Sequence, residues 1–158
     1  MDYGQLRLAM VRSRLFWKVA SGIDGQQAVA GTRVWNLDAI CETKAVAELL
    51  ALDVPVILAG DYNVMPTGLD AYKPERWRDD ALFRPETKEA FHTLTGQGWT
   101  DALRRLHPRE RIYTFWNQFR NAWRRDAELR IDHFLLAPAV AGRLQSAGVD
   151  CHVHGWEK

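Results

Sequence analysis

The chain has 158 residues, of which 47% are apolar and 26% charged, and its 21 Lys and Arg residues balance 20 Asp and Glu residues. This composition is typical of one folded globular domain and excludes collagen, a coiled coil and wholesale disorder. The near-zero net charge argues against a histone-like polycation, and no apolar run approaches the roughly 20 residues that span a bilayer.

The first forty residues carry the weakest structural pattern of the chain. The segment 6–20 is amphipathic and rich in arginine, which favours a surface helix or a poorly packed extension. Cys41 and Cys151 lie far apart and have no metal-binding spacing, so we interpret them as reduced thiols of a cytoplasmic protein.

From residue 44 onward the signals of helices and strands alternate. Residues 44–52 carry an apolar stripe of good helix formers, and the short β-branched run 54–60 predicts a buried, parallel strand. A helix that leads into a buried strand favours an α/β fold. The other expected elements are a helical turn near 74–77, helices at 86–98, 99–107 and 138–146, and strands at 112–116, 129–137 and 148–154.

An aspartate and an asparagine directly follow the expected strand at 54–60. Asp61 and Asn63 are two residues apart, so on an extended backbone their side chains face the same side. A carboxylate beside a carboxamide can position a water near a phosphate and take its proton. The alternative is a side-chain-capped turn, because both residue types favour turns.

A second carboxylate lies inside the apolar run LRIDHFLL. Burying Asp132 alone is unfavourable, so we expect it to face a polar site, as a metal ligand or as the partner of a catalytic histidine. The alternative is a salt bridge to Arg130. His133 faces the other way, and we interpret it as a packed structural histidine.

The stretch 104–130 is both basic and aromatic. It holds eight arginines against Glu110, Asp126 and Glu128, a local net charge of +5, and five aromatic side chains are interleaved with them. Arginine binds phosphate through two parallel hydrogen bonds, and aromatic rings stack on bases. This combination predicts a nucleic-acid surface, and the alternative is a solvated helix face with core aromatics.

Six blocks of sequence then occur in a specific order: AGDYNVMPT (59–67), LDAYKPERW (69–77), GWTDALRRLHP (98–108), YTFWNQFRNAWRRD (113–126), LRIDHFLLAP (129–138) and GVDCHVHGWEK (148–158). Together they closely resemble the exodeoxyribonuclease III family of DNA-repair nucleases, within the endonuclease/exonuclease/phosphatase superfamily. The resemblance covers residues 44–158, about the second half of the family's catalytic domain, and leaves 1–43 as a poorly matched N-terminal segment.

The resemblance implies a fold and a reaction. The fold is a four-layer α/β sandwich of two packed β-sheets flanked by helices, here partial and truncated. The reaction is Mg²⁺-dependent hydrolysis of DNA phosphodiesters, with Mn²⁺ as the alternative ion. The implied partner is double-stranded DNA with abasic sites or 3′ ends, and no membrane is involved.

The resemblance also implies residue roles. Asp61 matches the aspartate that activates or orients the attacking water, Asn63 the asparagine that holds the scissile phosphate, and Asp132 the aspartate that orients the catalytic histidine. The matched pocket for the abasic sugar comprises Phe115, Trp116 and Leu129. The further DNA contacts that we expect from the basic stretch are Arg120, Arg124 and Arg125.

The metal region departs from the family pattern. The family holds its metal through a glutamate in a Gln-Glu-Thr-Lys motif with an asparagine upstream. Here WN at 35–36 and CETK at 41–44 match those fragments, which makes Glu42 the candidate ligand, and the alternative is a relic of the motif without a metal role. Glu42 precedes Asp61 by less chain than the family's first sheet needs, and the sequence stops before the family's Ser-Asp-His motif.

We therefore expect a truncated or internally deleted nuclease whose turnover is below that of its family. Two other hypotheses stay open. One is a non-catalytic DNA-binding remnant that uses the stretch 104–130. The other is a phosphatase of the same superfamily that acts on a small phosphate ester.

Overall fold

The computed structural model of the chain describes residues 6–12, 17–19, 33–36, 43–51, 54–115 and 128–149. Within these ranges the strands form a three-stranded sheet in the order β2-β1-β7 and a four-stranded sheet in the order β3-β4-β6-β5. The strands are β1 Leu6–Arg12, β2 Trp17–Val19, β3 Arg33–Asn36, β4 Val56–Asp61, β5 Thr100–Asp101, β6 Asp132–Leu136 and β7 Leu144–Val149. The helices are α1 Thr43–Ala51, α2 Pro85–Gly96, α3 Ala102–Leu106 and α4 Pro138–Ala141, with short 3-10 turns η2 Gly68–Asp70 and η3 Pro74–Arg76.

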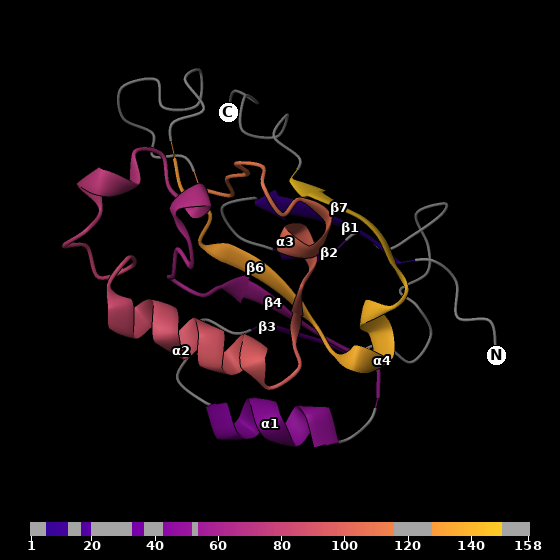
Figure 1. Cartoon of the computed structure of the whole chain (residues 1–158). Coiled ribbons are helices and arrows are strands. Elements are labelled where there is room, and N and C mark those ends of the chain that lie inside the picture. The colour runs from indigo at the N-terminus through magenta and orange to yellow at the C-terminus, as the bar shows by residue number, and fades with distance from the viewer. Residues whose placement is uncertain are drawn as a thin grey trace.

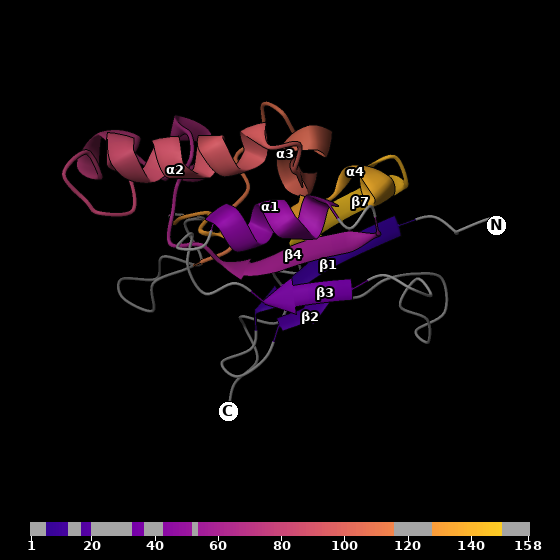
Figure 2. The same ribbon diagram turned by 90° about the horizontal axis from the view of Figure 1, so that it is seen from below.

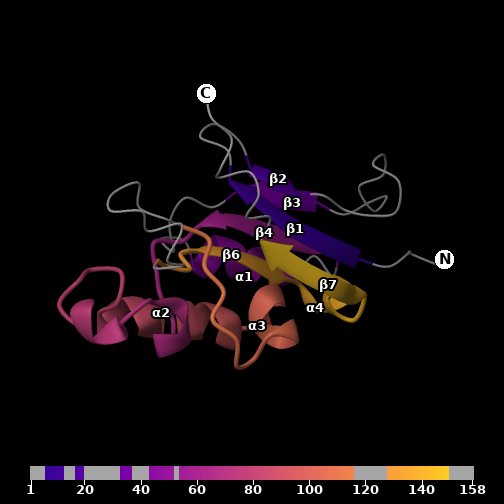
Figure 3. The same cartoon turned by 90° about the horizontal axis from the view of Figure 1, so that it is seen from above.

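The two sheets and the helices are arranged in layers. The three-stranded sheet lies over one face of the four-stranded sheet, and α1 and α2 lie on the opposite face (Figures 1 and 3). Seen from below, α1 lies next to β4, and α2 lies on the far side of α1 from β3 and β2 (Figure 2). Helix α3 contacts β5, β6 and β7, so it spans the edge where the two sheets meet. The predicted α/β sandwich of two packed sheets with flanking helices is confirmed.

The four-stranded sheet is built on a strand–helix–strand unit. Strand β3 runs parallel to β4, and α1 connects the two. Because parallel neighbours need a crossover connection, the helix signal at 44–52 and the strand signal at 54–60 are parts of one unit. Strand β6 pairs antiparallel with the other side of β4, and β5 pairs antiparallel with β6.

The expectation of a helix or loose extension at 6–20 is wrong. Residues 6–12 form β1, which pairs parallel with β7 and antiparallel with β2. Leu6, Leu8 and Met10 alternate with other residues, which is the period of two that strands need. The same segment also shows a helix-like spacing of its arginines, so the sequence carries both patterns. Pairing with a strand more than a hundred residues later decides between the two patterns.

Two strands that are buried along nearly their whole length form the centre of the core. Every residue of β6 is buried, and so are the first five residues of β4. Val46 of α1 and Phe91 and Leu94 of α2 pack into the same cluster. Burial on both faces explains why the run 54–60 shows no polar alternation.

The remaining elements follow the sequence with several differences, among them the unpredicted strand β5 at Thr100–Asp101, inside the expected helix 99–107, and β7 at Leu144–Val149 in place of the expected strand 148–154. The turn at 74–76, the helices at 85–96 and 102–106 and the strand at 132–136 lie where we expected them. The expected strand at 112–116 is reduced to one bridge between Phe115 and Leu129. The expected helix at 138–146 ends at Ala141 with Gly142 as its cap, because Leu144 already begins β7 beside β1.

Candidate active site

Two predicted catalytic carboxylates meet at one end of the central strand pair. Asp61 is the last residue of β4 and Asp132 the first of β6, and the register sets them directly opposite each other. Directly opposed residues of an antiparallel pair point to the same face, with Cβ atoms about 4.5–5.5 Å apart. Asp61 is half-buried and Asp132 is fully buried, so Asp61 is the more accessible of the two residues to solvent.

The chain turns sharply after Asp61. The N–H of Asn63 donates to Oδ1 of Asp61 at 2.9 Å, and Asn63 has a φ of 51°, in the left-handed region. The extended backbone that we expected for Asp61 and Asn63 is therefore wrong, and the side-chain-capped turn is present. Asparagine tolerates this conformation better than most residues, and the turn leaves its side chain exposed at the strand end.

Tyr62 anchors the turn from the inside. Its N–H donates to the carbonyl oxygen of Ile131 at 2.9 Å, and its ring lies edge-on to the rings of Phe91 and His133. Burial, aided by the nearby charge of Asp101, raises the pKa of the Tyr62 phenol far above its ordinary range. Tyr62 is therefore a neutral packing residue that holds Asp61 and Asn63 against β6.

The two described members of the predicted sugar pocket lie side by side. Phe115 and Leu129 exchange backbone hydrogen bonds in both directions, at 2.9 and 3.1 Å, and Leu129 also bridges to Ala71. Leu129 is buried and Phe115 half-buried, so together they present one apolar edge. The other predicted residues of this surface, and the metal candidate, lie outside the described residues: Trp116, Arg120, Arg124, Arg125 and Glu42.

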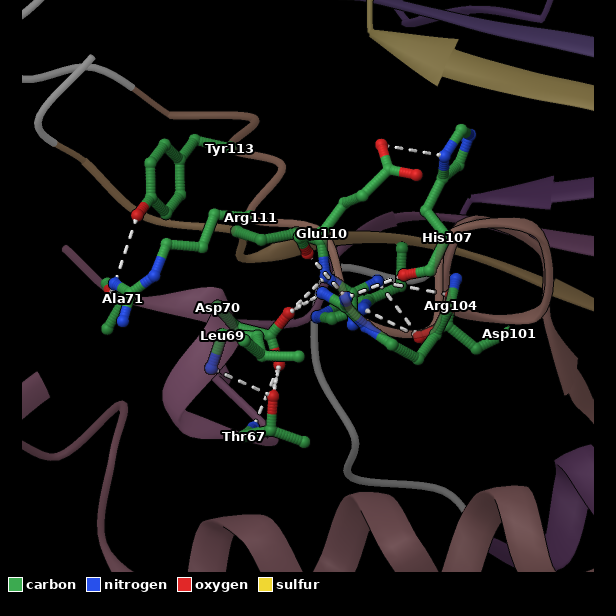
Figure 4. A network of polar contacts seen from close by, with 12 residues as sticks. Thr67, Leu69, Asp70, Ala71, Asp101, Arg104, His107, Glu110, Arg111 and Tyr113 are labelled. Carbon is green, nitrogen blue, oxygen red and sulfur yellow. Dashed lines mark hydrogen bonds and ion pairs between the residues drawn. The ribbon is translucent and has the colours of Figure 1, made fainter.

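A buried ionic network, which the sequence did not reveal, includes Asp70, Asp101 and Arg104 (Figure 4). Oδ1 of Asp70 accepts from Nε of Arg130 and from Nη2 of Arg104, both at 2.6 Å. Nη1 of Arg130 donates to both carboxylate oxygens of Asp101, at 3.1 and 2.9 Å. Arg130 is therefore held by Asp70 and Asp101, which replaces the simple salt bridge to Asp132 that we had considered.

Each member of the network is also tied to the backbone. Oδ2 of Asp70 accepts from the N–H and the hydroxyl of Thr67, at 2.8 and 2.7 Å, and the carbonyl oxygen of Asp70 accepts from the N–H of Arg130 at 2.7 Å. Asp101 caps α3 by accepting from the N–H of Arg104. The network thus joins the loop after β4, the start of α3 and the entry to β6.

The charges of the network stabilise one another. Burial is the largest single influence and would raise the pKa of Asp70 and of Asp101. The charge of Arg130, together with the hydrogen bonds that each carboxylate accepts and the other nearby charges, outweighs it and lowers both pKa values. Burial opposes the charge on Arg130 as well, and the two carboxylates raise its pKa in return. All three groups are therefore charged near neutral pH.

His133 is the packed structural histidine that we expected. It is fully buried, its Nε2 lies 3.1 Å from the carbonyl oxygen of Val64, and its Nδ1 lies 3.8 Å from Oδ2 of Asp101. Burial, followed by the charge of Arg130, lowers the pKa of His133. The imidazole is therefore neutral, and because a carbonyl only accepts, Nε2 carries its proton.

The oxygen donors at this strand end suit a hard divalent cation. Mg²⁺ is usually held by one or two carboxylates, with waters and substrate phosphates completing its shell. Asp61 offers such a carboxylate, and β3 ends at Asn36, in register with Ala59, at the same edge of the sheet. In the part of the chain that the structure describes, no group of three or more His, Cys, Asp or Glu side chains is placed to hold a metal ion.

The two packed sheets with flanking helices, and two acidic side chains at the ends of paired strands, define an α/β sandwich with a candidate acidic site. The sequence matches the Endonuclease/Exonuclease/phosphatase family over residues 12–154, and the chain belongs to that family. The family that the sequence blocks resemble is thereby confirmed.

Relatives within the family are named as DNA nucleases. The chain is 38% identical over 97 residues to the DNA repair nuclease APEX1 of Danio rerio, covering 60% of this chain and 31% of that protein. It is 31% identical over 117 residues to an exodeoxyribonuclease of Bacillus subtilis, covering 72% of this chain and 46% of that protein. The chain thus spans less than half the length of these two relatives.

A solved structure shares the fold closely. The 3′-5′ exonuclease NExo of Neisseria meningitidis superposes with a TM-score of 0.78 and 28% identity, covering 82% of this chain and 58% of that one. An AP endonuclease of Archaeoglobus fulgidus superposes with a TM-score of 0.59 and 25% identity, covering 72% of this chain and 52% of that one.

Among the described residues, no helix is both long and apolar enough to cross a membrane.

We expect Arg130→Met to destabilise the fold strongly. The substitution keeps the apolar stem but leaves Asp70 and Asp101 facing each other without their shared cation. Breaking a buried ion pair on one side costs about 3–5 kcal/mol, and urea unfolding of the purified chain measures this loss. Arg105→Met on the exposed face of α3 is the matched control and should change the free energy of unfolding by less than about 0.5 kcal/mol. Equal effects of the two substitutions would contradict the network.

We expect His133 to make stability pH-dependent below neutrality. Its pKa in the folded chain lies below the ordinary value of about 6.5, so the unfolded chain takes up the proton first. The free energy of unfolding should therefore fall from pH 7 to pH 5, by at most about 1.4 kcal/mol per pH unit.

His133→Gln keeps an N–H donor for Val64 and should flatten this pH dependence. His92→Gln, on the exposed side of α2, is the control and should leave the slope as it is in the unaltered chain. Urea unfolding at pH 5, 6 and 7 measures all three chains. The same slope in His133→Gln as in the control would show that His133 does not titrate as described.

Proposed function

We propose that this chain carries the catalytic end of a Mg²⁺-dependent nuclease that hydrolyses phosphodiesters of double-stranded DNA. The observation that carries the proposal is the register that sets Asp61 opposite Asp132. The names of the relatives, which are a DNA repair nuclease, an exodeoxyribonuclease and a 3′-5′ exonuclease, support DNA as the substrate. Abasic sites and 3′ ends are the sites of cleavage within this proposal.

Each residue at the strand end has a role that suits its exposure. Asp61 is half-buried, so its carboxylate can reach a water and take the proton as that water attacks phosphorus. The exposed carboxamide of Asn63 can donate hydrogen bonds to the phosphate oxygens. Asp132, buried at the opposed position of β6, would orient the catalytic histidine of the family's Ser-Asp-His motif, which the 158 residues do not contain.

The metal belongs to the same edge of the sheet. Glu42 directly precedes Thr43, where α1 begins, and the connection from β3 to α1 leaves β3 at its carboxyl end. From the family resemblance of CETK at 41–44 we propose Glu42 as a ligand, with Asp61 as a further carboxylate of the same site. When bound, Mg²⁺ supplies a Lewis acid that stabilises the charge developing on the phosphoryl oxygens, and Mn²⁺ is the alternative ion.

The DNA surface continues from the strand end along the chain. Phe115 and Leu129 form one apolar edge, and Trp116 completes the pocket for a sugar without its base. Three arginines of the adjoining segment bind the DNA backbone: Arg120, Arg124 and Arg125. The apolar edge of Phe115 and Leu129 supports recognition of an abasic site, because a sugar that lacks its base fits an apolar surface and offers no base edge to hydrogen-bond.

Two further expectations stay predictions. The division of the chain into residues 1–43 and 44–158 rests on the sequence blocks alone, although β1 and β3 show that the first part contributes strands to both sheets. The cytoplasmic location rests on the two cysteines.

We expect Asp61→Asn to remove DNA cleavage. The assay is Mg²⁺-dependent cleavage of a duplex with one abasic site by the purified chain, with a 3′-recessed duplex and a 3′-phosphate duplex as parallel substrates. General-base catalysis contributes about 10²–10⁴-fold, so the rate should fall by at least about 100-fold. Asp79→Asn, on the exposed loop before α2, is the control and should keep the full rate.

The same assay separates the alternatives. Cleavage that survives Asp61→Asn would contradict the assigned site. Salt-dependent DNA binding without Mg²⁺-dependent cleavage would favour the non-catalytic DNA-binding remnant. Hydrolysis confined to a small phosphate ester would favour the phosphatase.

A further inference from the structure

Thr114 is a fully buried polar side chain that the roles above do not include. It is 1% exposed, and its hydroxyl oxygen accepts from two successive backbone amides, the N–H of Ile131 at 3.2 Å and the N–H of Asp132 at 3.1 Å. These are the two residues at the entry to β6. The hydroxyl therefore satisfies backbone donors at the point where the chain delivers Asp132 to the strand end.

The same segment is fixed from its other side. The N–H of Thr114 donates to the carbonyl oxygen of Leu129 at 2.8 Å, and the neighbouring Phe115 exchanges hydrogen bonds with Leu129. The carbonyl oxygen of Ile131 accepts from Tyr62, the residue after Asp61. Thr114 thus stands between the aspartate pair and the apolar edge made by Phe115 and Leu129.

We propose that Thr114 is a positioning residue, which sets the Asp132 carboxylate against Asp61 and fixes its distance from the sugar pocket. The inference rests on the proposed function, because it assigns Thr114 to the same site. Thr114 acts through the backbone of Asp132 and touches neither the substrate nor the reacting atoms. Sub-ångström placement of catalytic groups strongly affects rates, so loss of this hydroxyl should act on the chemical step.

The choice of substitutions separates positioning from packing. Thr114→Val keeps the shape and the β-branch but removes the acceptor, which leaves two buried N–H groups without that oxygen. Thr114→Ser keeps the hydroxyl and loses one methyl group. Thr95→Val on α2 is the control, because the Thr95 hydroxyl bonds to carbonyls of its own helix, away from the strand end.

The first readout is steady-state cleavage of the abasic duplex. We expect Thr114→Val to lower kcat by at least about tenfold while KM stays within about twofold, because the hydroxyl acts on the placement of Asp132 and not on DNA binding. Thr114→Ser should retain kcat within about threefold, and Thr95→Val should match the unaltered chain. Equal kcat in the Val and Ser variants of Thr114 would overturn the proposal.

The second readout does not depend on activity. Hydrogen exchange at the amides of Ile131 and Asp132, followed by NMR, should be at least about tenfold faster in Thr114→Val than in Thr114→Ser. Unchanged exchange would overturn the positioning role whatever the kinetics show, and faster exchange with unchanged kcat would also overturn it. If the unaltered chain cleaves no DNA, the proposed function is contradicted. The amide exchange rates of Thr114→Val and Thr114→Ser would then test on their own whether Thr114 holds the Ile131 and Asp132 amides.

Discussion

The register between β4 and β6 is the constraint on which the rest of the site depends. Side chains alternate between the two faces of a strand, so a slip of one residue would turn Asp132 away from Asp61 and bring His133 into its place. The burial of β6 on both faces leaves little hydrophobic preference for one register over the next. Polar groups at the entry of β6 therefore have to specify it.

Two sets of contacts meet that need. Arg130 is locked between Asp70 and Asp101 two residues before Asp132, and Thr114 accepts the N–H groups of Ile131 and Asp132. A buried ion pair contributes little net stability compared with apolar side chains, but its loss on one side is strongly unfavourable. We interpret the network as the set of contacts that fixes the register of β6 against β4. The neutral His133 beside it completes the buried layer without adding a charge.

The sequence predicted the elements whose signals are local. The run at 54–60 and the apolar stripe at 44–52 are recognisable from their own residues. Asp61 and Asp132 stood out because a carboxylate in or beside a buried strand is unfavourable unless it is paired or has a polar site to face. The partners of Arg130 were not predictable in this way, because Asp70 lies 60 residues earlier and Asp101 lies 29 residues earlier. Strand β1 was missed for the same reason, since its partner β7 is at the other end of the chain. For residues 61–63 the sequence allowed both an extended backbone and a side-chain-capped turn. Only the backbone geometry of Asn63 distinguishes the two.

The proposed mechanism requires Asp61 and Asp132 to work as one catalytic unit. A double-mutant cycle on DNA cleavage tests this requirement most directly. Asp61→Asn, Asp132→Asn and the double variant are compared on the abasic duplex with Mg²⁺. Groups that act as a unit are strongly non-additive, so the double variant should be no slower than the slower single variant by more than about threefold. Losses that multiply in the double variant would mean that the two carboxylates act independently, and would contradict the account.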